Sequence, residues 1–221
     1  TSVLRKAKYI ILNLSSDESL IIHLGMSGRI IITKNNEKKF KHTHICINFT
    51  KSLFLHFIDP RRFGYIFLTR TDNIGSHKFF RDLGVEPLSK KFNYRFLLKL
   101  LMGKKSSIKN IIMNQKYIVG VGNIYAAESL FISGIHPTKL GVDLTKYDCK
   151  NLVKAIKAVL KKSIRLGGSS INDHTMISGK MGYFQNKLKV YGREELKCRK
   201  RTCQSPIIRI VIAQRSSFYC S

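Results

Sequence analysis

Residues Tyr9–Leu24 read YIILNLSSDESLIIHL, two apolar runs that the polar segment Ser15–Glu18 divides. Isoleucine-rich runs of this length with a polar break between them are typical of two strands joined by a turn. Four similar runs follow at intervals of about ten residues, a spacing typical of all-β domains. They are Arg29–Thr33, Ile45–Phe49, Leu53–Ile58 and Tyr65–Thr69. Six short strands in succession predict an antiparallel sandwich or barrel at the start of the chain.

The periodicity becomes helical after the segment Gly84–Pro87. The clearest helix is Cys149–Leu166, because its apolar residues recur at helical spacing and basic residues occupy the remaining positions. The apolar positions are Leu152, Val153, Ile156, Val159, Leu160 and Ile164. Gly167 and Gly168 then end the helix. A β-rich part followed by a helical part predicts an α+β chain with more than one domain.

The charge of the chain is strongly unbalanced. Forty Lys and Arg against thirteen Asp and Glu give a formal net charge of +27. A field of that sign attracts polyanions, so the candidate partners are nucleic acid, an anionic membrane or a very acidic protein. No apolar run is long enough to span a bilayer, and the start has no secretory signal. A lysine-rich protein without a polyanionic partner stays open as the alternative.

Three of the five cysteines gather near the C-terminal end: Cys198, Cys203 and Cys220. Their spacing resembles most of a four-ligand zinc ribbon, with two strand-like runs, Ile207–Val211 and Ser217–Tyr219, between the last two cysteines. A structural zinc ion would fold this small hairpin. Four residues separate the first pair where ribbons usually have two, and a fourth ligand is absent, so incidental cysteines stay possible.

Two turns of the β-rich part carry candidate binding residues. Asp59-Pro-Arg-Arg-Phe-Gly64 is punctuated by Pro and Gly, so Arg61, Arg62 and Phe63 should project from the domain. Two arginines beside an aromatic ring suit a phosphate clamp and a wedge between bases, or simply a solvated turn. In His23-Leu-Gly-Met-Ser-Gly28 the glycines permit Met26 to point outward, although Met at a hairpin is also common core filler.

A third motif, Val119-Gly-Val-Gly-Asn123, is a tight turn that leads into a helix. With Asn123 as the expected cap, the free amides at the helix start would form an anion site suited to a DNA phosphate. The remainder of a dinucleotide fingerprint is absent, which argues against a nucleotide cofactor.

Taken in order, the motifs resemble the formamidopyrimidine-DNA glycosylases, bacterial enzymes that repair 8-oxoguanine. The resemblance extends over nearly the whole chain. It rests on Lys8-Tyr9, His23–Gly28, Asp59–Gly64, Leu83–Pro87, Val119–Tyr125, Gly134–Pro137, Val190–Arg193 and Gln214–Cys220. It implies a β-sandwich domain within residues 1–72, a helix-two-turn-helix domain over 83–175 and an incomplete zinc-finger hairpin over 186–221. Damaged double-stranded DNA would lie between them.

The resemblance also implies a bifunctional DNA glycosylase and abasic-site lyase. An amine attacks the sugar of a flipped-out oxidised purine, and β- and δ-elimination then cut the strand. Lys8 matches the general acid of β-elimination, and Arg215 matches the residue of δ-elimination. The other matched residues face DNA. Met26, Arg61 and Phe63 fill the gap left by the base, while His42, Lys104, Lys109 and Asn123 contact phosphates, and His23 and Arg62 complete the expected DNA-binding set.

The chain departs from the family pattern at both ends. The family nucleophile is the amine of an N-terminal proline followed by a glutamate, a pair that does not occur ahead of Lys8, so Thr1 is not given that role. Cys198 is displaced from the expected zinc ligand and the last ligand would lie beyond Ser221, so zinc binding is an open question. A catalytically impaired protein that only binds damaged DNA is therefore the alternative function.

A loop that spans residues 168–184 resembles the lesion-capping loop of the family and favours oxidised purines over oxidised pyrimidines. The ordered motifs argue against an RNA-binding protein, since RNA offers wedge residues no stacked B-form step. We expect a monomer in the bacterial cytoplasm, associated with the nucleoid, with Cys46 and Cys149 as plain reduced thiols.

Overall fold

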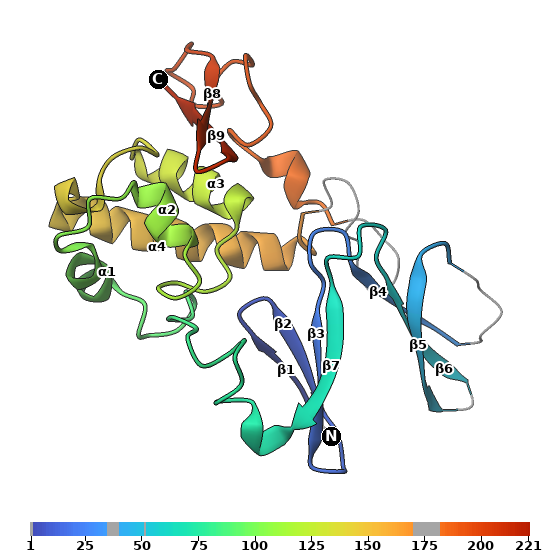
Figure 1. The fold of residues 1–221 in the computed structure, drawn as a ribbon. Coiled ribbons are helices and arrows are strands. Elements are labelled where there is room, and N and C mark those ends of the chain that lie inside the picture. Colours follow the sequence, from blue (N-terminus) through green and yellow to red (C-terminus); the bar gives the residue numbers. More distant parts are fainter. Residues whose placement is uncertain (1, 35–39, 51, 170–181) are drawn as a thin grey trace. The chain divides into compact units, whose positions relative to one another are not determined.

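The computed structural model describes residues 2–34, 40–50, 52–169 and 182–221 (Figure 1). The chain divides into two compact units. The first unit comprises residues 1–81 and 163–186, and the second comprises residues 82–162 and 187–221. Among the described residues, no helix has the length and apolar content that crossing a bilayer requires. The lesion-capping loop expected from the sequence falls mostly outside the described residues.

The first unit is built from two antiparallel sheets, as the sequence predicted. One sheet has the order β1-β2-β3-β7 and the other the order β4-β6-β5. The strands are β1 (Ser2–Lys6), β2 (Tyr9–Asn13), β3 (Glu18–His23), β4 (Arg29–Thr33), β5 (Thr43–Thr50), β6 (Leu53–Ile58) and β7 (Tyr65–Arg70). Both sheets contribute to one apolar core that includes Ile22 from the first sheet and Leu55 and Phe57 from the second. The short helix η1 (Thr71–Asn73) follows β7.

Strand β1 was not predicted from the sequence. All five of its residues are exposed, because it forms the edge of its sheet. An edge strand with neither face buried lacks the alternation of apolar and polar residues on which the prediction depended.

The second unit holds four helices around one core: α1 (Tyr94–Leu101), α2 (Ile108–Met113), α3 (Asn123–Ser133) and most of α4 (Lys146–Arg165). All four contribute buried side chains to this core. Asn93 caps α1 by accepting from the amides of Arg95 and Phe96, each at 3.0 Å. The helix expected over Cys149–Leu166 begins three residues earlier, at Lys146. The short helix η2 (Gly141–Asp143) also belongs to this unit, whereas η3 (Phe184–Lys187) lies mostly in the first unit.

The start of α3 corrects one expectation. The cap residue is Gly122, whose backbone is extended, and no side chain caps this helix. Asn123 is the first helical residue, and its side chain bonds elsewhere. Gly134 ends α3 in the left-handed conformation with φ of 68°, which glycine adopts without a steric penalty.

The chain ends in a hairpin of β8 (Ile207–Ile212) and β9 (Arg215–Cys220). Ala213 and Gln214 form its two-residue turn, and their positive φ values of 47° and 61° suit the twist of a tight hairpin. Ile207 and Phe218 of the hairpin pack with Phe131 of α3 in a second small core. The hairpin therefore has a fixed place on α3.

The buried carboxylate of Glu128 fixes the segment that precedes the hairpin. Glu128 lies on α3 and accepts hydrogen bonds from the backbone amides of Lys189, Val190 and Tyr191 at 2.9–3.0 Å. A buried carboxylate is costly unless donors surround it, and three successive amides meet that need here. This arrangement ties residues 189–191 to α3.

Candidate functional site

Two turns of the first unit present the apolar candidates side by side. Met26 is 60% exposed and Phe63 is 59% exposed, both unusual for large apolar side chains. A Cβ atom on Gly25 would lie 2.6 Å from both the carbonyl carbon of Phe63 and the amide nitrogen of Gly64. The backbones of the two turns are therefore in direct contact. Met26 is displayed to solvent and is not core filler.

A buried carboxylate holds these turns together. Asp59 is fully buried, accepts from the Ser27 hydroxyl at 2.5 Å and accepts from the amide of Gly64 at 2.7 Å. The amide of Arg61 adds contacts to Asp59 and Ser27 at 3.3 and 3.2 Å. Burial acts to raise the pKa of Asp59, but the hydrogen bonds from Ser27 and the turn amides outweigh it and lower the pKa.

Arg61 and Arg62 project from this turn, as the sequence predicted. Both are exposed, and Arg62 has a φ of 57° in the left-handed region. His42 is also exposed with a φ of 66°, and its carbonyl oxygen accepts from the amide of Asp59 at 3.1 Å. His42 therefore bonds to the first residue of the Asp59–Gly64 turn, and this same turn carries Arg61, Arg62 and Phe63.

Lys8 lies in the turn between β1 and β2, exposed and close to His23 at the end of β3. The ring of His23 stacks on Tyr65 with centroids 5.1 Å apart, and its Nδ1 accepts from the amide of Gly25 at 3.0 Å. Burial and the positive charge of Lys8 lower the pKa of His23. A neutral His23 beside a charged Lys8 is the state that this geometry favours near neutral pH.

The second unit gathers three candidates at the hairpin turn. Lys109 on α2 is only 1% exposed, and its ammonium donates to the Ser216 carbonyl at 2.9 Å and to the Ser217 hydroxyl at 2.5 Å. Asn123 donates to the same Ser216 carbonyl at 2.9 Å. Burial, with the charge of Arg215 as a second cause, lowers the pKa of Lys109 to about 8. Arg215 itself is exposed at the start of β9.

Lys104 stands apart from that group. It follows α1, is half-buried and donates to the hydroxyl of Tyr117 at 3.3 Å. Its ammonium also lies 5.1 Å from the centre of the Tyr117 ring, a favourable cation–π position. Neither the hydroxyl nor the ring of Tyr117 carries a formal charge, so this contact does not cancel the positive charge of Lys104.

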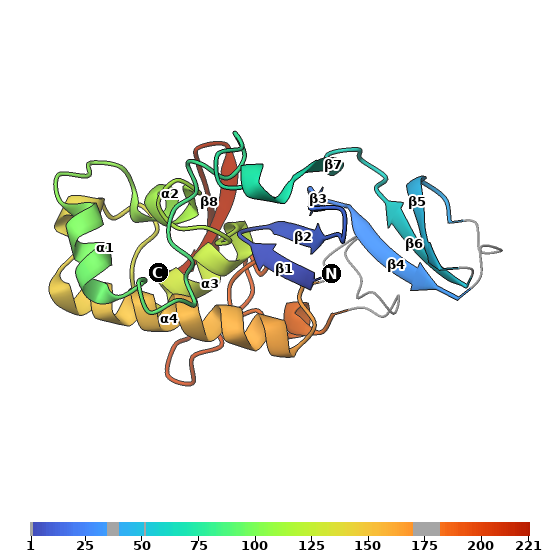
Figure 2. The same ribbon diagram turned by 90° about the horizontal axis from the view of Figure 1, so that it is seen from below.

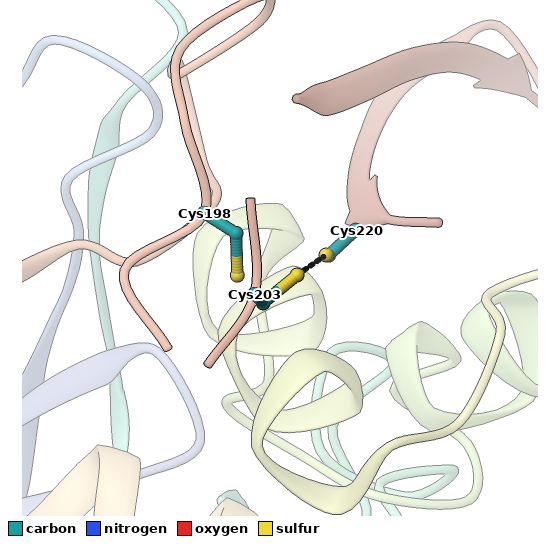
Figure 3. A group of neighbouring side chains, drawn as sticks. All are labelled: Cys198, Cys203 and Cys220. Carbon is teal, nitrogen blue, oxygen red and sulfur yellow. Dashed lines mark hydrogen bonds between the residues drawn. The ribbon is translucent and has the colours of Figure 1, made fainter. Parts of the chain in front are cut away.

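The three cysteines predicted as metal ligands do converge (Figure 3). Their Sγ atoms all lie within 4.8 Å of one another, and those of Cys203 and Cys220 are 3.4 Å apart. Tetrahedral zinc thiolates, with bonds of about 2.3 Å, place sulfur atoms about 3.8 Å apart. The donor set therefore fits three corners of a zinc tetrahedron, and the four residues between Cys198 and Cys203 do not prevent this.

The pKa values of Cys203 and Cys220 are shifted in opposite directions. A backbone hydrogen bond from Ser205, followed by one with Cys220, lowers the pKa of Cys203 to about 7. Burial raises the pKa of Cys220 to about 12. Cys203 is thus more readily converted than Cys220 to the thiolate that a metal ion binds.

Two family models together match most of the chain. Residues 1–66 match the formamidopyrimidine-DNA glycosylase N-terminal domain, and residues 83–175 match the formamidopyrimidine-DNA glycosylase H2TH domain. The chain belongs to the formamidopyrimidine-DNA glycosylase family. The resemblance recognised in the sequence motifs is therefore confirmed.

Relatives within the glycosylase family cover almost all of the chain. The formamidopyrimidine-DNA glycosylase of Rickettsia africae is 46% identical over 218 residues, which are 99% of this chain and 79% of that protein. The formamidopyrimidine-DNA glycosylase of Hydrogenovibrio crunogenus is 44% identical over 220 residues, which are 100% of this chain and 77% of that protein.

Solved structures of glycosylase family members share the fold. The Lactococcus lactis Fpg in complex with DNA that contains an abasic site superposes with a TM-score of 0.89 at 32% identity, covering 99% of this chain and 79% of that one. The Thermus thermophilus MutM (FPG) protein superposes with a TM-score of 0.88 at 33% identity, covering 99% and 80%. The predicted α+β class with antiparallel sheets and a cysteine-bearing hairpin is confirmed.

Sequence reasoning missed the glycosylase residues that hold the site together. Asp59 was interpreted only as part of a turn, and Ser27, Ser216 and Ser217 were assigned no role. A signal was present at Asp59, since an acidic residue ahead of Pro60 and two arginines can accept from the turn that follows. Ser216 gave none, because its carbonyl is a backbone group that any residue would supply.

Proposed function

We propose that this chain is a DNA base-excision repair enzyme that removes oxidised purines such as 8-oxoguanine and formamidopyrimidines and cleaves the abasic strand. One observation carries this function. The contacting turns display Met26, Arg61 and Phe63 together in a chain that is 46% identical to a formamidopyrimidine-DNA glycosylase. Its partner is damaged double-stranded DNA.

A base inside the stack is out of reach, so the enzyme must extrude it and stabilise the gap. Exposed apolar side chains next to a cation suit that role, because they replace stacking while the cation meets the bases or phosphates. We assign Met26 and Phe63 to the gap and Arg61 to the orphaned partner base. Asp59 and Ser27 keep the three in register.

The remaining DNA contacts are assigned by charge and exposure. His42 and Arg62 border the Asp59 turn and face phosphates beside the gap, and His23, which accepts from the amide of Gly25, completes the DNA-binding set. Lys104 keeps an uncancelled charge, and Asn123 opens α3, where free amides favour an anion. Lys109 supports these contacts by holding Ser216 and not as a phosphate contact, since its own ammonium is buried.

For the strand cleavage we assign Lys8 to β-elimination as general acid and Arg215 to δ-elimination. Lys8 is exposed, and the neutral His23 beside it imposes no competing charge. Arg215 sits one residue from the carbonyl that Lys109 and Asn123 both hold, so its backbone is anchored from two helices. Fixing the backbone limits the side chain to a small region, as elimination chemistry requires.

We propose zinc as the metal of the cysteine cluster, held by Cys198, Cys203 and Cys220. Zinc in such a cluster is structural and supplies folding free energy to a hairpin that is too small for a large core. By joining residue 198 to residue 220, it would keep β9 and Arg215 in place.

The proposed parts are a catalytic domain within residues 1–72, a DNA-gripping helix-two-turn-helix domain over 83–175 and the finger over 186–221. We propose that the enzyme works as a monomer at the bacterial nucleoid. The second candidate is a lesion-binding protein without catalysis, because the exposed Met26, Arg61 and Phe63 would serve binding of a damaged duplex whether or not the strand is cut.

The test uses duplex DNA with one 8-oxoguanine or one abasic site, and the same undamaged duplex as control. We expect the 221-residue chain to bind the lesion duplexes in preference. A chain extended with the proline-bearing segment of the family should nick them and be trapped covalently by borohydride. Preferential binding of the lesion duplexes, without nicking or covalent trapping by the extended chain, favours the binding-only function. Equal binding of damaged and undamaged DNA would overturn the proposal.

A further inference from the structure

One prominent feature of the second unit has no role in the proposed function. Helix α4 carries lysines along one side, here called the α4 lysine stripe: Lys146, Lys150, Lys154, Lys157 and Lys161. At about 100° of rotation per residue, their side chains fall within an arc of about 80°. At about 1.5 Å per residue, the stripe is about 22 Å long.

A different side of α4 is the buried one. Cys149, Leu152, Val153 and Ile156 pack into the core that α4 shares with α1, α2 and α3. The only acidic residue of the helix, Asp148, lies off the stripe and is paired with Lys139 at 2.8 Å. The stripe is therefore cationic over its whole length.

The surroundings of the stripe do not cancel its charge. Lys146 and Lys150 lie 5.9 and 5.3 Å from the centre of the Tyr94 ring, and Arg95 approaches the same ring at 5.8 Å. Lys157 donates to the carbonyl of Ser89 at 3.0 Å. Rings and carbonyls are neutral, and within the described residues none of these lysines has an acidic partner. Lysines three and four residues apart repel one another, so the stripe destabilises its own helix.

We propose that the α4 lysine stripe is a docking surface for a second segment of duplex DNA. Each strand of a duplex presents one phosphate per about 3.4 Å of the duplex axis, so a stripe of this length lies alongside a duplex segment that carries several phosphates. Cations on one rigid helix face need no ordering before they bind. The inference rests on the proposed function, which makes DNA the polyanion that the protein meets.

The stripe is separate from the contacts assigned to the lesion duplex. Lys109 belongs to α2 and Asn123 to α3, and Figure 2 shows α2 and α4 on opposite sides of the helical part of this unit. The protein can therefore engage one duplex at α2 and α3 while α4 holds another. Such a second grip permits direct transfer between DNA segments during the search for lesions.

The experiment measures recruitment of one duplex by another. A biotinylated lesion duplex on beads is saturated with the 221-residue chain and washed, and a fluorescent undamaged duplex is then added at several salt concentrations. The stripe variant replaces Lys146, Lys150, Lys154 and Lys161 with Gln. The control variant replaces four scattered exposed lysines with Gln, at positions 34, 78, 116 and 187, so that both variants lose the same charge.

We expect the unaltered chain and the control variant to recruit the second duplex, and the stripe variant to recruit about tenfold less. The slope of log affinity against log salt for recruitment should fall by roughly 3–4 in the stripe variant, since each phosphate contact contributes about 0.9. Capture of the bead-bound lesion duplex should be the same for all three proteins. Circular dichroism should show α4 intact in both variants.

Each other outcome overturns a distinct claim. Equal losses in the stripe and control variants would show that net charge alone recruits DNA, and no recruitment by the unaltered chain would exclude a second site. Preferential recruitment of anionic vesicles or single-stranded RNA would exclude duplex DNA as the partner. Failure to capture the lesion duplex on the beads would contradict the proposed function instead, before the second duplex is added.

Discussion

The ammonium of Lys109 donates a hydrogen bond to the carbonyl oxygen of Ser216, 107 residues further along the chain. This bond joins α2 to strand β9 at the residue immediately after Arg215, and Asn123 joins α3 to the same oxygen. A backbone carbonyl is thus the point at which two helices and the finger meet. Arg215 therefore takes its position partly from Lys109 and Asn123, which hold the carbonyl of the next residue.

Replacement of Lys109 by Met should weaken DNA binding by loosening this junction. We expect affinity for an abasic duplex to fall about three- to tenfold, a modest loss because the ammonium is buried and not itself at a phosphate. The salt slope of binding should stay nearly constant. Fluorescence anisotropy at several salt concentrations measures both. A slope reduced by about 1 would instead identify Lys109 as a direct phosphate contact.

The lowered pKa of Lys109 gives a second prediction, on stability. Its folded pKa is about 8, below the unfolded value of about 10.4. Between these values the unfolded state binds more protons, so stability rises with pH across that window. Relative to Lys109→Met, the unaltered chain should gain stability from pH 8 to pH 10 in urea titrations. A constant difference between the two proteins would contradict the burial of this ammonium.

Gly25→Ala should separate the two turns that carry Met26 and Phe63. The new Cβ would lie 2.6 Å from backbone atoms of the second turn, at a φ of +62° that also strains any other residue. Gly103→Ala is the matched control, since Gly103 has a φ of +68° but nothing within 4 Å. We expect the control to cost about 1–2 kcal/mol in stability, the strain alone.

Gly25→Ala should cost more than this control and should also reduce extrusion of the lesion base. The signal is the fluorescence of 2-aminopurine placed opposite or beside the lesion. Equal effects of the two substitutions on stability and on extrusion would mean that the turns act independently.

Asp59→Asn should weaken the same platform by removing an acceptor. An amide group cannot accept from both Ser27 and Gly64 as the carboxylate does, so one donor loses its partner. We expect a loss of about 1–3 kcal/mol. Because the folded pKa of Asp59 is lowered, its contribution is complete above pH 4 and disappears as pH falls through the folded value.

The control for Asp59 is Asp72→Asn, which changes an exposed carboxylate on η1. Chemical denaturation at pH 7 and at pH 3 compares the two substitutions. A difference between Asp59→Asn and the unaltered chain that is as large at pH 3 as at pH 7 would refute the role of the carboxylate charge.

Local pattern was enough to predict six strands, the long helix and the final hairpin. Arg29–Thr33 and Leu53–Ile58 were predicted with the bounds that the structure has, because each is a β-branched or aromatic run with clear ends. Pattern failed where burial did not alternate, as at Ser2–Lys6. It also failed at Asn123, because glycine at the cap position leaves no side-chain signal to compete with the residue that follows.

The site was predicted as a set of residue types, and the contacts among them were not. No spacing rule connects Lys109 with Ser216 or Ser27 with Asp59, since sequence separation sets no distance once the chain has folded. For the cysteines, in contrast, the sequence predicted the cluster although their spacing is unusual. The spacing of Cys198 and Cys203 departs from the usual ribbon, yet backbone bonds at Cys198 and Cys203 turn the segment so that the thiols meet.

Replacement of Cys220 by Ser should abolish metal binding and loosen the finger. Two thiolates remain after the substitution, too few to hold zinc firmly, whereas the intact cluster supplies three. We expect about one zinc ion per chain in the unaltered protein and almost none in the variant. Atomic absorption after dialysis gives the stoichiometry, and cobalt substitution adds a thiolate charge-transfer band as a second readout.

Cys46→Ser is the control, because Cys46 is an exposed thiol of the first unit. Loss of the ion should also weaken binding to abasic DNA, since β9 bears Arg215 at one end and Cys220 at the other. Equal zinc content in the two variants would exclude the cluster as the metal site, and zinc loss without weaker DNA binding would separate the metal from the placement of Arg215.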